Sequence, residues 1–84
     1  MTIRDTIKAA LQEIMENNAR IRPIEDSSEL VRDLGFSSLD VAELIAVLEM
    51  ELEADPFSNG VSLMEVRTYG DFCAVYEKEC QKTS

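Results

Sequence analysis

The stretch that decides the fold covers residues 33–53 and reads DLGFSSLDVAELIAVLEMELE. After Gly35 it contains neither glycine nor proline, and its apolar residues recur at the three- and four-residue spacings of one helical face. This pattern predicts a helix over Ser38–Glu53 with one buried side. The core-facing positions are Val41, Leu44, Ile45, Leu48 and Leu52.

A second helical stripe opens the chain, and a third one closes it. We expect the first helix over about residues 3–16 and the last helix from Thr68 onward. Each begins with a threonine three residues before an aspartate, which is the spacing of a capping box. The capping pairs are Thr2 with Asp5 and Thr68 with Asp71. The two stripes are formed by Ile3, Ile7, Leu11 and Ile14, and by Tyr69, Phe72, Cys73, Tyr76 and Cys80.

The connection over residues 18–37 is long for a small domain, and such loops tend to be functional. A short turn is expected around Ser28–Leu34. We expect the apolar residues of this connection to hold it against the core; they are Ile21, Ile24, Leu30, Val31 and Leu34.

Residues 54–67 are less regular. Asp55-Pro56 is expected to end the central helix, and Asn59-Gly60 is typical of a turn. Ser62 and Glu65 have the spacing of a cap for one short helical turn. That turn would contain Leu63, Met64 and Val66.

These elements predict one all-α domain over residues 1–84. No segment alternates with a period of two residues, so no strand is expected. The simplest architecture is a small four-helix bundle with three main helices and one short helix.

The charge of the chain is strongly acidic, with 17 Asp and Glu against 8 Lys and Arg. Eight of the acids lie between Asp33 and Glu65, where there is no base. Nucleic acid and anionic membrane surfaces are therefore unsuitable partners, and basic proteins are suitable ones. The simpler alternative is a solvated face that keeps the protein in solution.

The cysteines and the missing histidine restrict the chemistry further. Cys73 and Cys80 would lie about 10 Å apart along one helix, too far for a disulfide, so we interpret them as core thiols. The chain has no histidine and no CxxC pair, which argues against a metal site. There is no signal-peptide layout and no apolar run of about 18 residues. We expect a cytoplasmic protein without membrane insertion.

Two adjacent serines mark the start of the central helix. Ser37 is placed to act as its N-cap. Ser38 then falls in the first turn, where its hydroxyl points outward beside free N–H groups that favour a phosphate. A serine hydrolase is improbable because no histidine can serve as the base. We expect no catalytic residue.

The outer face of the central helix carries an apolar strip with acids beside it. The strip consists of Leu39, Ala42, Ala46 and Met50, with Glu43 on the same side and Asp40 at its edge. Single exposed apolar residues are ordinary. Four on one line favour a docking surface on which the acids orient a basic partner.

The residues from Leu34 to Asp40, LGFSSLD, followed by Glu43-Leu44, resemble the acyl carrier protein motif, usually L-G-x-D-S-L-D-x-V-E-L. The resemblance covers nearly the whole chain. It implies that Ser38 receives 4′-phosphopantetheine from coenzyme A through a separate phosphopantetheinyl transferase. The thiol of that arm would then carry acyl groups as thioesters.

The resemblance also implies partners and a place for the cargo. The partners would be acyl transferases and ketosynthase-type enzymes with basic docking patches. The carrier itself is expected to be a monomer. The apolar strip and its acids, with Glu43 for recognition, would be the docking surface. An acyl chain could be sheltered in an interior that includes Ile45, Leu48 and Leu63.

The sequence departs from the family pattern at several points. Ser37 stands in place of the usual aspartate, Ala42 in place of the usual valine, and residues 56–68 follow no family pattern. These departures favour a specialised pathway of fatty acid or polyketide-type synthesis. An aminoacyl or peptidyl carrier, and an unmodified acidic helical adaptor, remain as alternatives.

Overall fold

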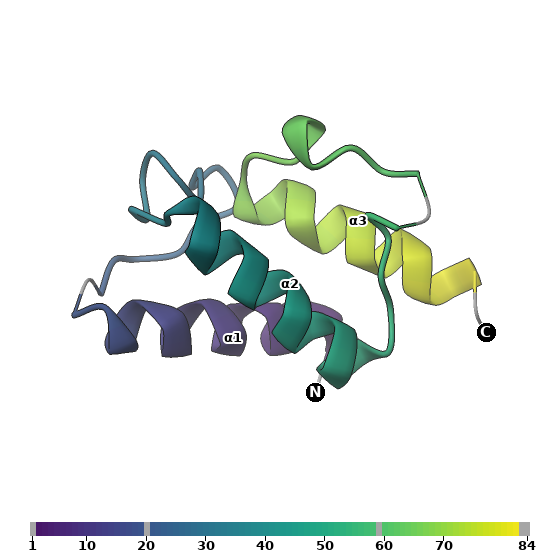
Figure 1. Cartoon of the computed structure of the whole chain (residues 1–84), viewed down its shortest axis with the longest axis horizontal. Coiled ribbons are helices and arrows are strands. Elements are labelled where there is room, and N and C mark those ends of the chain that lie inside the picture. Colours follow the sequence, from purple (N-terminus) through teal and green to yellow (C-terminus); the bar gives the residue numbers. More distant parts are fainter. Residues whose placement is uncertain (1, 20, 59, 83–84) are drawn as a thin grey trace.

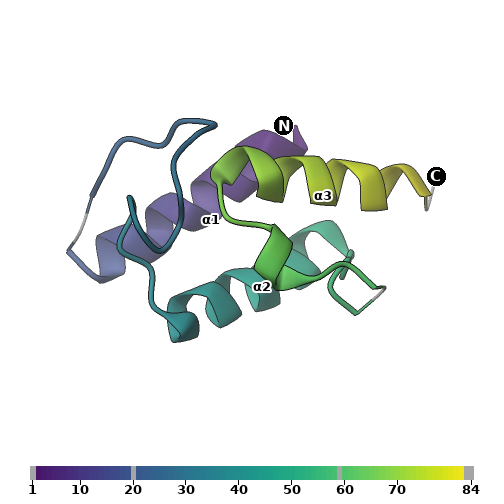
Figure 2. The ribbon, with the colours of Figure 1, turned by 90° about the horizontal axis from the view of Figure 1, so that it is seen from above.

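The computed structural model of the protein describes residues 2–19, 21–58 and 60–82. Within them the chain forms α1 (Ile3–Asn17), α2 (Ser38–Leu52), the short 3₁₀ turn η1 (Leu63–Glu65) and α3 (Tyr69–Lys82). α1 packs against both α2 and α3, and α2 crosses it obliquely (Figures 1 and 2). The predicted all-α bundle is confirmed, with the fourth helix reduced to a single 3₁₀ turn.

The two predicted capping boxes are present at the starts of α1 and α3. The Oγ1 atom of Thr2 accepts from the N–H of Asp5 at 3.1 Å, and the N–H of Thr2 donates to the Asp5 carboxylate at 3.2 Å. Thr68 and Asp71 exchange the same two bonds at 3.0 and 3.2 Å. The bonds from the Thr2 and Thr68 N–H groups favour the ionised carboxylates, so the pKa values of Asp5 and Asp71 lie below the usual range.

The core is formed by the helical stripes that the sequence predicts. On α2, Val41, Leu44 and Leu48 are buried, and Ile45 and Leu52 are partly buried. The core also contains Ile7, Ala10, Leu11, Ile14 and Met15 of α1, and Tyr69, Phe72, Cys73 and Tyr76 of α3.

Both cysteines have the core positions expected of them. Cys73 is fully buried, Cys80 packs partly buried against the core, and neither forms a disulfide with another described residue. Burial raises the pKa of the Cys73 thiol, because it penalises the thiolate, although a hydrogen bond with Tyr69 partly offsets the rise. Cys73 is therefore an inert structural thiol.

The long connection before α2 is held by only part of its apolar side chains. Leu30 and Leu34 are buried as expected, but Ile21 and Val31 are 75% and 65% exposed, so their predicted contact with the core is wrong. The chain instead buries Phe36, which the helical spacings gave no reason to select.

A tight turn carries the chain from this connection into α2. The N–H of Asp33 donates to the carbonyl of Glu29 at 2.9 Å, as expected for a turn in this region. The N–H of Phe36 donates to the carbonyl of Leu30 at 2.9 Å, across Gly35 with φ +74°. Because this closure needs a left-handed residue, glycine is suited to position 35.

The segment after α2 corrects two predicted details. α2 ends at Leu52, one residue before the predicted end, because Glu53 takes a left-handed conformation with φ +52°. Ser62 makes no side-chain cap bond to η1, so the predicted Ser62–Glu65 cap is wrong. Asn59, half of the predicted Asn59-Gly60 turn, lies outside the described residues.

Backbone hydrogen bonds join the long connection to the start of α3. The N–H of Leu30 donates to the carbonyl of Arg67 at 3.0 Å, and the N–H of Tyr69 donates to the carbonyl of Ser28 at 2.8 Å. They surround an isolated antiparallel bridge between Glu29 and Thr68. This junction fixes residues 28–30 beside residues 67–69, next to the start of α2.

Candidate functional site

The N-terminus of α2 is held by a third capping box. The Oγ atom of Ser37 accepts from the N–H of Asp40 at 3.2 Å, and the Asp40 carboxylate accepts from the N–H of Ser37 at 2.9 Å. The side-chain amide of Asn18, at the end of α1, also donates to Asp40 at 3.2 Å. The predicted cap at Ser37 is confirmed, and Asp40 is its reciprocal partner.

Ser38 follows this cap as the first residue of α2, and it is exposed. By helix geometry, the N–H groups of Ser38 and Leu39 have no carbonyl of a preceding turn to bond. They point toward the end of the helix that carries the positive end of the macrodipole. A phosphate ester on the Ser38 hydroxyl would lie where these donors and the dipole stabilise its negative charge.

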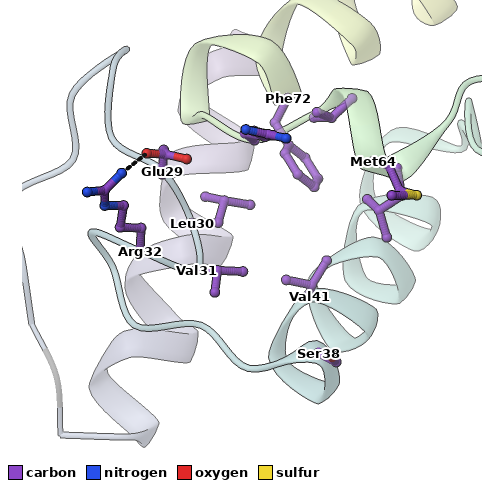
Figure 3. Close-up of a pocket in the computed structure, with 11 residues that line it drawn as sticks. Glu29, Leu30, Val31, Arg32, Ser38, Val41, Met64 and Phe72 are labelled. Atoms are coloured by element: carbon purple, nitrogen blue, oxygen red, sulfur yellow. Dashed lines mark ion pairs between the residues drawn. The ribbon is translucent and has the colours of Figure 1, made fainter.

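A pocket of about 420 Å³ opens beside Ser38 (Figure 3). It lies between residues 29–32, the first turn of α2, η1 and the start of α3. Its apolar lining consists of Leu30, Val31, Val41, Leu63, Met64, Val66 and Phe72. Glu29, Arg32 and Arg67 supply the charged part of the lining, and Glu29 pairs with Arg32 at 3.9 Å.

The pocket differs from the interior that the sequence predicts as a shelter for cargo. Leu63 lines it as expected, but Ile45 and Leu48 do not, because Leu48 is fully buried between the helices. The lining is instead completed by Val31, which belongs to the long connection, and by Phe72 of α3. No spacing rule connects these residues, since the backbone junction that brings them together is a tertiary feature.

The outer face of α2 presents the predicted strip to solvent. Leu39 and Met50 are 79% and 82% exposed, and Ala42, Glu43 and Ala46 are exposed between them. Asp40 is only partly exposed because its carboxylate is engaged by the cap and by Asn18. The capping role of Asp40 was missed, although Ser37-x-x-Asp40 has the spacing already recognised at Thr2 and Thr68.

The comparison with known families agrees with this geometry. A family model described as the phosphopantetheine attachment site matches residues 5–75, which include all of α2, the pocket lining and most of α1. The chain belongs to this phosphopantetheine-binding carrier family. No curated protein and no solved structure matches the chain.

Domains of this family bind 4′-phosphopantetheine covalently, and they interact with phosphopantetheinyl transferases and with partner enzymes. The protein is therefore a phosphopantetheine-carrying carrier protein. Its site fits the group, because an exposed hydroxyl stands at a helix N-terminus beside an apolar pocket. When bound, the group supplies a thiol that holds cargo as a thioester. Among the described residues, no helix is long and apolar enough to cross a membrane.

Proposed function

We propose that residues 1–84 form a single carrier domain, a monomer, with 4′-phosphopantetheine attached to Ser38. Its cargo would be acyl or ketide intermediates of fatty acid or polyketide-type synthesis, in a specialised pathway of the cytoplasm. The observation that supports this most strongly is the position of Ser38, exposed at the first residue of a capped helix and lining an apolar pocket.

The carrier takes part in the attachment as a substrate. The Ser38 Oγ attacks phosphorus in the pyrophosphate of coenzyme A, an Oγ–P bond forms, and adenosine 3′,5′-bisphosphate leaves. The hydroxyl proton passes to a base of the transferase, because this chain has no histidine to accept it. The chain contributes an ordered helix end whose N–H groups and dipole stabilise the product phosphodiester.

Intact mass spectrometry tests the attachment residue. The protein is incubated with coenzyme A and a broad-specificity phosphopantetheinyl transferase. The expected result is a gain of one phosphopantetheine that is lost in Ser38→Ala and retained in Ser37→Ala. A gain that survives in Ser38→Ala and is lost in Ser37→Ala would reassign the attachment, and no gain under any condition would favour the acidic adaptor.

The exposed strip of α2 is proposed as the docking surface for the transferase and for basic partner enzymes. It consists of Leu39, Asp40, Ala42, Glu43, Ala46 and Met50. Because apolar residues are aligned with acids beside them, a partner can bury the first and pair with the second. Its position directly after Ser38 would bring a docked enzyme to the attachment point.

Transferase kinetics test this surface. Glu43→Gln and Leu39→Ala are expected to raise the KM for the carrier severalfold with little change in kcat, and the effect of Glu43→Gln should shrink at high salt. Glu16→Gln is the matched control, because Glu16 is an exposed acid on α1. Equal effects of the Glu16 and Glu43 substitutions would show that total charge matters and that the strip does not.

A further inference from the structure

The inner end of the pocket beside Ser38 is closed by an aromatic side chain. Phe72 lines the pocket, although it is only 1% exposed. In Figure 3 Ser38 and Phe72 lie at opposite ends of the pocket, with Val41 and Leu30 between them. A chain that enters beside Ser38 would therefore pass two aliphatic side chains and then meet the Phe72 ring.

The Phe72 ring is held from behind by two other aromatic rings. It stacks on Tyr76 with ring centroids 6.2 Å apart and an interplanar angle of 18°. Phe57, from the segment after α2, lies 5.8 Å from Phe72 and 6.1 Å from Tyr76. Each of the three rings therefore packs against the other two.

The space behind these rings is filled by the core. Leu44 and Leu48 of α2 and Tyr76 of α3 are fully buried, and none of them lines the pocket. The pocket thus stops short of these core residues. The pocket volume of about 420 Å³ lies in the lower half of the range for small-molecule sites.

We propose that Phe72 limits the length of the enclosed cargo and makes this protein a carrier of short apolar acyl groups. The inference rests on the proposed attachment at Ser38. Apolar walls favour an alkyl chain, and each enclosed methylene raises the equilibrium constant for enclosure roughly fourfold. A methylene beyond Phe72 stays in water and adds nothing.

Thioester protection measures the enclosed length. The protein is loaded from a series of acyl-coenzyme A donors, acetyl to dodecanoyl, and hydroxylamine cleavage is followed by intact mass. For the natural chain, the cleavage rate is expected to fall with each added pair of methylenes and then to level at a short chain. A rate that keeps falling up to dodecanoyl would overturn the proposal.

Two variants separate the role of Phe72 from general stability. Phe72→Leu replaces the ring with a smaller side chain. The acyl-chain length at which the cleavage rate levels, which we call the levelling point, should therefore become longer. Phe57→Leu is the matched control, because Phe57 belongs to the same ring cluster but does not line the pocket; its levelling point should not move. If both variants, or neither, move the point, Phe72 does not set the length. If Phe72→Leu fails to fold, Phe72→Met serves the same purpose with an unbranched side chain.

A second measurement keeps the inference separate from the attachment residue. Free S-butyryl and S-dodecanoyl pantetheine are added to the unmodified protein, and the amide resonances of Val41 and Phe72 are followed by NMR. Saturable shifts at both residues are expected with the short probe, and the long probe should bind no more tightly. If Ser38 accepts no arm but these shifts appear, the proposed attachment fails and the length limit stands. If neither probe shifts these amides, the length limit fails even where Ser38 is modified.

Discussion

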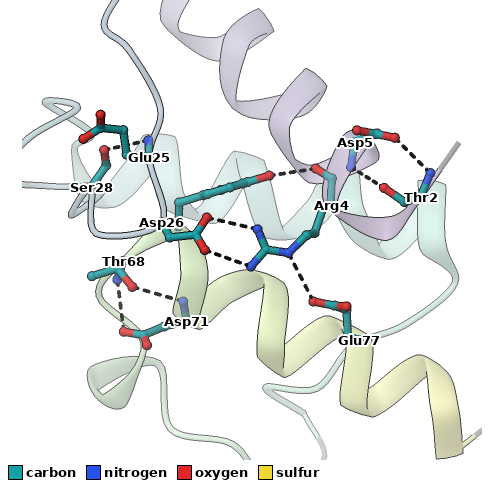
Figure 4. Close-up of polar contacts among 10 residues, drawn as sticks. Thr2, Arg4, Asp5, Glu25, Asp26, Ser28, Thr68, Asp71 and Glu77 are labelled. Carbon is teal, nitrogen blue, oxygen red and sulfur yellow. Dashed lines mark hydrogen bonds and ion pairs between the residues drawn. The ribbon is translucent and has the colours of Figure 1, made fainter.

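Two ends of the molecule use their polar groups in opposite ways. On the side of α1 and α3, the Arg4 guanidinium bonds both carboxylate oxygens of Asp26, at 3.0 and 3.3 Å, and approaches Glu77 at 3.6 Å (Figure 4). It also lies over the Tyr69 ring, 5.7 Å from the centroid, while the Tyr69 hydroxyl donates to the Arg4 carbonyl at 3.0 Å. Here one base ties α1, the long connection and α3 together.

These contacts change the ionisation of the groups that make them. The bond from Arg4 holds the pKa of the Asp26 carboxyl below its usual range, because it favours the ionised form. Burial raises the pKa of Tyr69 to about 12, with a further contribution from its hydrogen bond with Cys73. At neutral pH, Asp26 is therefore ionised and Tyr69 is neutral. We call this group of residues, which consists of Arg4, Asp26, Tyr69 and Glu77, the tied end.

At the end of α2 that carries Ser38, the polar contacts are those of the cap, where Asp40 bonds Ser37 and Asn18. The ion pairs between described residues take their acids from positions 26, 29 and 77, all outside the acidic stretch of residues 33–65. That end keeps apolar side chains in solvent, including Met64, which is 85% exposed. The difference teaches that the Arg4 side joins three segments through one base, whereas the Ser38 side keeps apolar side chains exposed where a cofactor and partners could contact them.

The largest loss of stability is expected from a substitution at Gly70, which contacts Asp26 of the tied end. A Cβ atom at this position would lie 2.9 Å from the backbone carbonyl oxygen of Asp26, the same oxygen that accepts from the Gly70 N–H at 2.9 Å. Gly70→Ala should therefore lower the free energy of unfolding by about 2 kcal/mol, even though alanine favours a helix. Urea denaturation measures the loss. A gain in stability would contradict the close approach.

A smaller effect is expected from the cap at Ser37, which belongs to the other end. Ser37→Ala removes the oxygen that accepts from the Asp40 N–H, so it should cost about 1 kcal/mol. Ser37→Asp keeps an acceptor and should stay near the stability of the natural protein. Thermal melts by circular dichroism compare the three chains. If the alanine and aspartate variants melt together, the cap bond contributes nothing.

Two tyrosines of α3 differ in the hydrogen bonding of their hydroxyl groups. The Tyr69 hydroxyl has its carbonyl partner, whereas the buried Tyr76 hydroxyl has no hydrogen-bond partner in the described part of the chain. Tyr69→Phe should therefore destabilise the fold, and Tyr76→Phe should stabilise it, each by about 0.5–1 kcal/mol. Chemical denaturation gives both values. A loss in both variants would mean that Tyr76 finds a partner in solution.

The smallest effect is expected from salt. Screening should relieve repulsion among the acids of residues 33–65 and weaken the exposed Arg4 pairs, so these two responses oppose each other. We expect the first to prevail in a chain with a net charge of −9, and the melting temperature to rise slightly with moderate salt. Arg4→Gln should show a larger rise, because it has no pairs to lose. A falling melting temperature in both chains would show that the acids repel less than their number suggests.

Most of the fold could be predicted because helices leave periodic signals. The stripes of α1, α2 and α3 and their three-residue capping spacings are local, and they placed Ser37 and Ser38 correctly at the start of α2. The surroundings of Ser38 were harder to predict from the sequence. The turn at Gly35 positions Phe36, and the hydrogen bonds that join Leu30 to Arg67 and Tyr69 to Ser28 hold the start of α3, and with it Phe72, beside the long connection. These bonds depend on contacts far apart in the sequence.

The backbone junction between residues 28–30 and 67–69 also affects the order of events during synthesis. Ser38 and the whole of α2 leave the ribosome before Arg67 and Phe72 do, and bringing residues 30 and 67 together requires a long loop to close. The hydroxyl is thus present on the nascent chain before its pocket can exist. The pocket beside Ser38 can therefore form only after Arg67 and Phe72, which line it, have been synthesised.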